Sequence, residues 1–241
     1  MIQKALQYII SLGEAKTHII NDDVYSDKPL HRIDTYFPKA DAIKMTTLSS
    51  LVDYIKSNVD SMSEKMIIQV VSPEKVRLIS QLDDNRERES LVEVMASVPG
   101  FNYESFIGHE TFCINVQAKF LDDPATDKAL ILKFAGTMES GTVAEYGDDG
   151  VSQKATVKTG IASKGDAIVP NPVKLRPYRT FVEVEQPVSE FIFRVKDSGH
   201  GISCAIFEAD GGAWKNAAMK NIKNYLEFEL SEMLDRFTII S

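Results

Sequence analysis

Residues 171–187 combine basic and aromatic side chains in a spacing that suits nucleic-acid binding. The basic and aromatic members of this segment, NPVKLRPYRTFVEVEQP, are Lys174, Arg176, Tyr178, Arg179 and Phe181. Guanidinium groups pair with phosphates and aromatic rings stack on bases, so the segment could form a platform for a single strand, with Lys215 adding positive charge. The alternative, which we favour, is that Arg176 and Arg179 form ion pairs with acidic residues of the same chain or of a neighbouring subunit.

A second candidate site is the glycine pair Gly211-Gly212, which lies between a β-rich run and a helical pattern. Phosphate-binding loops use the same order of strand, glycines and helix. The segment has neither GxxxxGK[ST] nor GxGxxG, so we interpret it as a turn in which Asp210 is the N-cap of the helix. Trp214 is then a core anchor on that helix. Anion binding by amides at the helix start remains the alternative.

The sequence contains no pattern of catalytic or metal-binding residues. The four histidines, His18, His31, His109 and His200, have none of the spacings of zinc ligands. There is no GxSxG motif, and nothing in the sequence supports a catalytic triad built on either cysteine. Acidic pairs would hold a divalent cation, as in a nuclease, only if they converged: Asp122 with Asp123, Asp148 with Asp149, Glu183 with Glu185, and Glu208 with Asp210. We therefore predict a non-enzymatic protein with no catalytic residues, no metal and no cofactor.

Composition and charge limit the partners. The 241 residues are 44% hydrophobic and carry a net charge of −8, so the surface as a whole should repel nucleic acid unless it has a local basic patch. Cys113 and Cys204 have no CxxC spacing, and we interpret them as core residues in a reducing compartment. No window reaches the roughly twenty apolar residues of a membrane span. These features predict a cytoplasmic protein without membrane contact.

The first hundred residues are predicted to contain helices and a small sheet. Apolar residues at helical spacing predict an amphipathic helix over 2–12 that stops at Gly13. Its apolar stripe must be covered, and the favoured cover is the core of the protein itself. The alternatives are a partner or a membrane surface, although the polar face lacks the basic residues that an anionic membrane would select. The remaining expected elements are a polar surface connection over 21–44, a helix over 48–59 capped by Thr46 or Thr47, a hairpin of strands 66–71 and 75–82, and a third strand within 86–98.

Beyond Pro99-Gly100, the pattern predicts central helices, then strands and a long final helix. The expected elements are helices through 112–120 and over 129–138, a hairpin around Asp148-Asp149-Gly150, strands over 175–186, 189–197 and 202–209, and a helix after Gly212. This order predicts an α+β fold with a largely antiparallel β-sheet, an N-terminal amphipathic helix, central helices and a long C-terminal helix. The expected lobes are 1–100 and 101–241, or one continuous domain.

Three segments of the C-terminal half resemble a known family in their order and spacing. They are DDGVSQKATVKTGI, NPVKLRPYRTFVEVEQPVSEFIFR and FEADGGAWKNAAMKNIKNYL. Together they resemble the C-terminal signature of the YfdQ-like family, a phage and prophage group of unknown function, over about residues 145–230. The resemblance implies a phage or prophage product in the cytoplasm of a bacterial host, and it supplies no catalytic residues.

The function predicted first is that of a self-assembling phage accessory or host-takeover protein that binds a host or phage partner as a homo-oligomer. The alternatives are a single-strand-binding accessory of phage replication or recombination, an anti-defence protein that sequesters a signalling nucleotide, and a metal-dependent nuclease. The candidate ligand-binding residues are Lys174, Arg176, Tyr178, Arg179, Gly211, Gly212 and Lys215.

Overall fold

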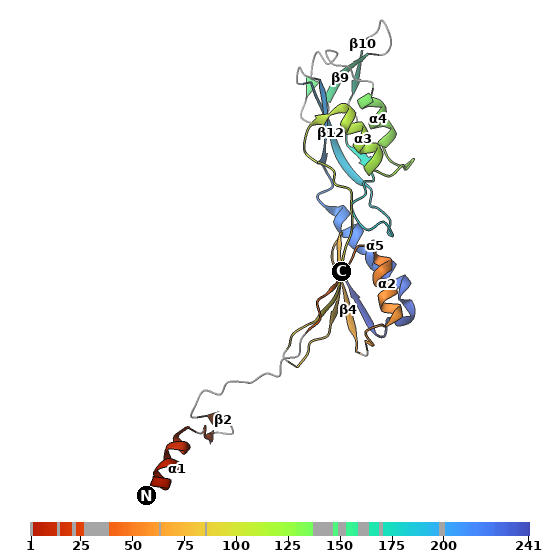
Figure 1. Ribbon diagram of the computed structural model, residues 1–241. Coiled ribbons are helices and arrows are strands. Elements are labelled where there is room, and N and C mark those ends of the chain that lie inside the picture. The colour runs from red at the N-terminus through yellow and green to blue at the C-terminus, as the bar shows by residue number, and fades with distance from the viewer. Residues whose placement is uncertain are drawn as a thin grey trace. The chain divides into compact units, whose positions relative to one another are not determined.

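The computed structural model contains helices together with antiparallel and mixed sheets, so the predicted α+β class is confirmed (Figure 1). It describes residues 2–13, 15–20, 23–26, 39–62, 64–84, 86–136, 147–148, 153–158, 164–168, 171–197 and 201–241. The chain divides into two compact units, residues 1–39 and residues 40–241. Each unit is described by itself.

The first unit contains the predicted N-terminal helix, α1 (Ile2–Gly13), followed by a short hairpin. The hairpin pairs β1 (Thr17–Ile20) with β2 (Asp23–Ser26) in antiparallel register. Strand β2 lies within the predicted surface connection, where no strand was expected. Residues 27–38, which form half of that connection, lie outside the described part of the chain.

A mixed five-stranded sheet carries the first of two hydrophobic cores in the second unit. Its strand order is β14-β4-β5-β6-β3, made by β3 (Ile43–Met45), β4 (Met66–Ser72), β5 (Lys75–Ser80), β6 (Ser90–Met95) and β14 (Phe237–Ile240). The central strands form the predicted hairpin and third strand, all antiparallel. The two edge strands β3 and β14, which the sequence analysis missed, are parallel to their neighbours.

Helices α2 (Leu48–Ser57) and α5 (Ala213–Glu229) pack on this sheet (Figure 1). Helix α2 begins at the predicted cap, because Thr47 Oγ1 accepts a hydrogen bond from the Ser50 amide at 3.2 Å. The apolar face of α5 is buried as predicted, through Trp214, Ala218, Ile222 and Leu226. Since α5 and β14 follow residue 100, segments from both sides of that residue build this core.

An antiparallel four-stranded sheet carries the second core. Its order is β11-β12-β13-β7, made by β7 (Ile107–Gly108), β11 (Val173–Leu175), β12 (Ser189–Asp197) and β13 (Ile202–Glu208). The predicted central helices are confirmed as α3 (His109–Lys119) and α4 (Lys128–Gly136), whose buried residues join this core. Phe112, Val116 and Phe120 recur every four residues and are all buried, as the pattern predicted.

A third small sheet has the order β10-β9-β8 and is also antiparallel. It consists of β8 (Gly147–Asp148), β9 (Gln153–Lys158) and β10 (Lys164–Ile168). Strands β8 and β9 pair where a hairpin was predicted. Of the three residues expected to form its turn, Asp148 is the last residue of β8, and Asp149 and Gly150 lie outside the described residues.

The prediction of a strand over residues 175–186 is wrong. Strand β11 ends at Leu175, and residues 176–188 form an irregular loop. Pro177 and Pro187 have no amide hydrogen for a β-ladder. In addition, the buried side chain of Gln186 forms hydrogen bonds with backbone amide and carbonyl groups of the loop. In a sheet, a neighbouring strand would have bonded such groups.

Candidate ligand pocket

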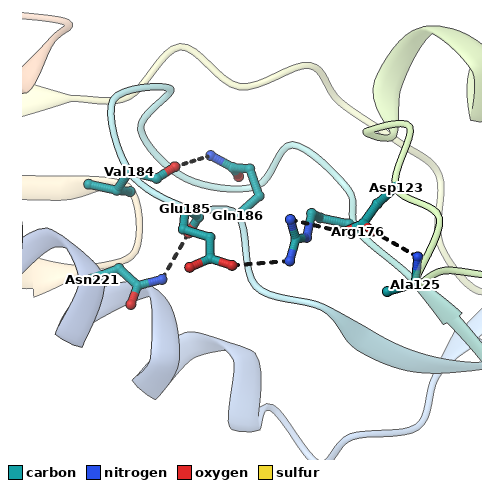
Figure 2. A network of polar contacts seen from close by, with 7 residues as sticks. All are labelled: Asp123, Ala125, Arg176, Val184, Glu185, Gln186 and Asn221. Atoms are coloured by element: carbon teal, nitrogen blue, oxygen red, sulfur yellow. Dashed lines mark hydrogen bonds and ion pairs between the residues drawn. The ribbon is translucent and has the colours of Figure 1, made fainter.

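The loop over residues 176–188 is organised around the side chain of Gln186. Its Oε1 accepts hydrogen bonds from the amides of Arg179 at 2.9 Å and Thr180 at 3.2 Å. Its Nε2 donates to the carbonyl oxygens of Phe181 at 2.8 Å and Val184 at 3.3 Å, the latter drawn in Figure 2. These bonds satisfy buried backbone groups on both arms of the loop and fix the position of Arg179.

The guanidinium of Arg179 is buried among aromatic rings, and the residue is 6% exposed. Its Cζ lies 3.9 Å from the ring centroid of Trp214 and 5.4 Å from that of Phe191. Nη1 donates to Glu208 Oε1 at 2.5 Å, and Nη2 donates to Ser189 Oγ. Burial lowers the pKa of Arg179, and Tyr103 and Glu208 oppose that shift. Arg179 is therefore a charge-paired cation stacked on Trp214.

A pocket of about 580 Å³ lies beside Arg179. Five separate segments build it: the β4–β5 turn, residues 98–103, the loop at 178–179, the end of β13 and the start of α5. Its aromatic residues are Phe101, Tyr103, Tyr178 and Trp214, and its charged residues are Glu74, Arg179, Glu208 and Lys215. Burial raises the pKa of Tyr103 to about 12, so its hydroxyl is protonated and can donate a hydrogen bond.

Three of the predicted binding residues meet at this pocket: Tyr178, Arg179 and Lys215. Tyr178 and Arg179 come from the loop after β11, whereas Lys215 lies in the first turn of α5. Lys174 is exposed on β11 and lines a different cavity of about 330 Å³, which it shares with Trp214.

Arg176 has a different environment from Arg179, although both were predicted to bind phosphate. Its guanidinium pairs with Asp123 at 3.0 Å and with Glu185 at 3.1 Å, as Figure 2 shows. The backbone oxygen of Glu185 in turn accepts a hydrogen bond from Asn221 of α5 at 2.9 Å. The favoured interpretation of the two arginines as ion-pair partners within the chain therefore matches the observed contacts, since Arg179 pairs with Glu208.

The glycine pair forms a tight turn rather than part of the pocket wall. Gly211 and Gly212 have φ angles of 62° and 81°, which side chains with a Cβ rarely adopt. Gly212 is the N-cap of α5, so the prediction of Asp210 as the N-cap is wrong. Asp210 Oδ1 instead accepts the Gly212 amide at 3.0 Å. The reason is that Gly211 and Gly212 both have left-handed backbone conformations, so the helix begins only at Ala213. Asp210 is therefore two residues too early in the sequence to be the N-cap.

Acidic residues of the described pairs bond basic partners and backbone amides, whereas the side chains of Asp148 and Asp149 lie outside the described part of the structure. Asp122 bonds the buried Nζ of Lys128 at 2.8 Å, and that ammonium also donates to the carbonyl of Phe120 at 2.6 Å. Glu183 accepts from the amide of Ser49 at 3.3 Å. Within the described part of the chain, no three residues among His, Cys, Asp and Glu form a group that could hold a metal ion. In that part of the chain, no helix is long and apolar enough to cross a membrane.

The two cysteines lack the features of a nucleophile. Burial raises the pKa of Cys113, and burial together with Cys113 raises that of Cys204 to about 12. Since the thiolate is the reactive form, we expect Ellman's reagent to modify the native protein slowly at about pH 8. Reaction should accelerate as the pH rises, with Cys113 first, and both thiols should react at once in denaturant. Rapid reaction of Cys204 in the folded protein would contradict this expectation.

Sequence reasoning missed Phe101, Tyr103 and Glu208 as neighbours of Arg179 in the pocket. The available signal was the Pro99-Gly100 pair, which is typical of a loop and comes just before two aromatic residues. Trp214 was predicted only as a core residue, and it is both buried and part of the pocket wall. Comparisons of the chain with protein-family models, with curated proteins and with solved structures find no match.

Proposed function

We propose that this is a non-enzymatic phage or prophage protein that assembles into a homo-oligomer in the bacterial cytoplasm and acts as an accessory factor by binding. The observation that carries the proposal is helix α1, in which none of the twelve residues is buried within its own compact unit. Ile2, Leu6 and Ile9 on its apolar stripe are 79%, 53% and 63% exposed. Removing such an apolar stripe from water by contact with a partner is favourable. The phage or prophage origin in this proposal rests on the resemblance of the C-terminal segments.

A second copy of α1 is the partner that its chemistry favours. The helix carries a single charged residue, Lys4, so it lacks the basic face that an anionic membrane would attract. Two such helices can pack their apolar stripes together without gathering like charges at the contact. Each copy would cover the other's stripe, as in a symmetric dimer.

We expect the combined substitutions Leu6→Gln and Ile9→Gln to dissociate the assembly, because they place two amides in the apolar contact. Light scattering or native mass spectrometry should give a multiple of 26.9 kDa for the original chain and 26.9 kDa for this variant. Gln7→Ala, on the polar face of α1, is the matched control and should leave the mass unchanged. A monomeric original chain at every accessible concentration would refute assembly.

A second candidate function, sequestration of a nucleotide, is supported by the pocket beside Arg179. Tyr178, Arg179 and Lys215 line it together. A single-strand platform receives less support, because Arg176 is held between two carboxylates and Arg179 is buried. Only Lys174 among the basic residues of that segment is exposed.

A further inference from the structure

We infer that the pocket beside Arg179 binds a planar ring that carries one anionic group, a ligand of the nucleoside monophosphate class. The inference rests on the proposed function by binding and specifies the ligand. Two features support it: the aromatic walls of the pocket and its balance of charge.

The aromatic walls favour a flat ligand. Phe101, Tyr103, Tyr178 and Trp214 reach the pocket from three separate parts of the chain. The rings of Phe101 and Tyr103 contact each other with centroids 4.9 Å apart. Aromatic side chains can stack on any nucleic-acid base, because every base has a flat π-face. The pocket volume of about 580 Å³ lies within the ordinary size range of small-molecule sites.

The charges of the pocket match a single negative group. Glu208 already pairs with Arg179, so Arg179 has little charge to offer a ligand. Lys215 is exposed, its Nζ lies 5.9 Å from the Trp214 ring centroid, and no carboxylate of the described chain pairs with it. Lys215 is thus placed to bind one phosphate or carboxylate. The neighbouring Glu74 and Glu208 would repel the further charges of a triphosphate.

The fluorescence of Trp214 offers a direct test, because it is the only tryptophan in the chain and it lies on the pocket wall. The full-length chain is titrated with adenosine 5′-monophosphate, adenosine, ATP and inorganic phosphate, with excitation at the red edge of the tryptophan band. We expect saturable quenching by the monophosphate, binding about tenfold weaker for adenosine, and no gain for ATP. Inorganic phosphate alone should give no change.

The matched variants lie on the same helix. Lys215→Gln should weaken binding of the monophosphate about tenfold and leave that of adenosine unchanged, because it removes only the partner of the phosphate. Lys220→Gln, which is also exposed on α5 but away from the pocket, should change neither. Equal losses in the two variants would indicate a general effect of charge and would overturn the assignment of Lys215.

Other outcomes overturn the inference as a whole. Tighter binding of ATP than of the monophosphate would identify a polyphosphate site, and competition by inorganic phosphate alone would identify a simple anion site. If neither the monophosphate nor adenosine quenches Trp214, the ligand class is wrong. If the chain assembles but does not respond to these probes, the proposed assembly stands and the ligand assignment is overturned. If the chain is monomeric but binds the monophosphate, the ligand assignment stands and the proposed assembly is overturned.

Discussion

Replacing Arg179 by alanine is expected to lower the free energy of unfolding by about 2–4 kcal/mol. The change removes the stack on Trp214 and the bonds to Glu208 and Ser189, and it leaves a cavity among aromatic rings. The Glu208 side chain is 31% exposed and can be hydrated once its partner is gone, which limits the cost. Urea denaturation followed by circular dichroism measures the difference.

Arg176→Ala is the matched control for this prediction. Arg176 lies in the same loop and is likewise ion-paired, but with two carboxylates, and its side chain is 24% exposed and stacks on no aromatic ring of the described residues. Its removal should therefore cost less, about 1 kcal/mol. Arg179→Lys should fall between the two, because an ammonium keeps the charge but not the planar stacking surface. Equal losses for Arg176→Ala and Arg179→Ala would contradict a special role for the buried stack.

Replacing Gln186 by glutamate should destabilise the protein by at least about 2 kcal/mol at neutral pH. A carboxylate can still accept from the amides of Arg179 and Thr180, but it cannot donate to the carbonyls of Phe181 and Val184. It would also place a negative charge beside those carbonyl oxygens in a site that is almost fully buried. The nearby Arg179 offsets part of this cost.

The same variant predicts a pH dependence with a definite sign. Burial raises the pKa of the introduced carboxyl in the folded state above its unfolded value of about 4.3, so the folded state binds the extra proton. Stability therefore falls, relative to the original chain, as the pH rises from about 4 to 8. Gln117→Glu, at an exposed position of α3, should change stability by less than about 0.5 kcal/mol. A deficit that is independent of pH would show that the introduced group is not buried.

Local signals in the sequence were sufficient for most helices and hairpins. Helix α2 begins at Thr47 because a threonine side chain can bond the amide three residues later, and this interaction needs no distant partner. Strands β4 and β5 pair around a short turn containing Pro73, where alternation and turn chemistry agree. These elements depend on residues that are close together in the sequence.

Features that depend on distant residues could not be predicted. The loop after β11 has the apolar and β-branched residues of a strand, but one buried glutamine side chain decides its structure. The pocket likewise requires Tyr103, Arg179 and Trp214 to meet from separate segments. The spacing of Arg176 and Arg179 gave no means to tell which arginine would be buried, because the partners Asp123 and Glu208 lie on other elements.

The parallel pairing of β14 with β4 has a consequence for how the chain acquires its structure during synthesis. Strand β4 is translated early, but its partner at 237–240 is added only after the whole stretch from 73 to 236. At typical rates of translation this interval lasts roughly 10–30 s, during which one edge of β4 has no strand beside it. Exposed edges of this kind pair readily with other chains. The nascent protein is therefore expected to need protection, by a chaperone or by slow production, until β14 leaves the ribosome.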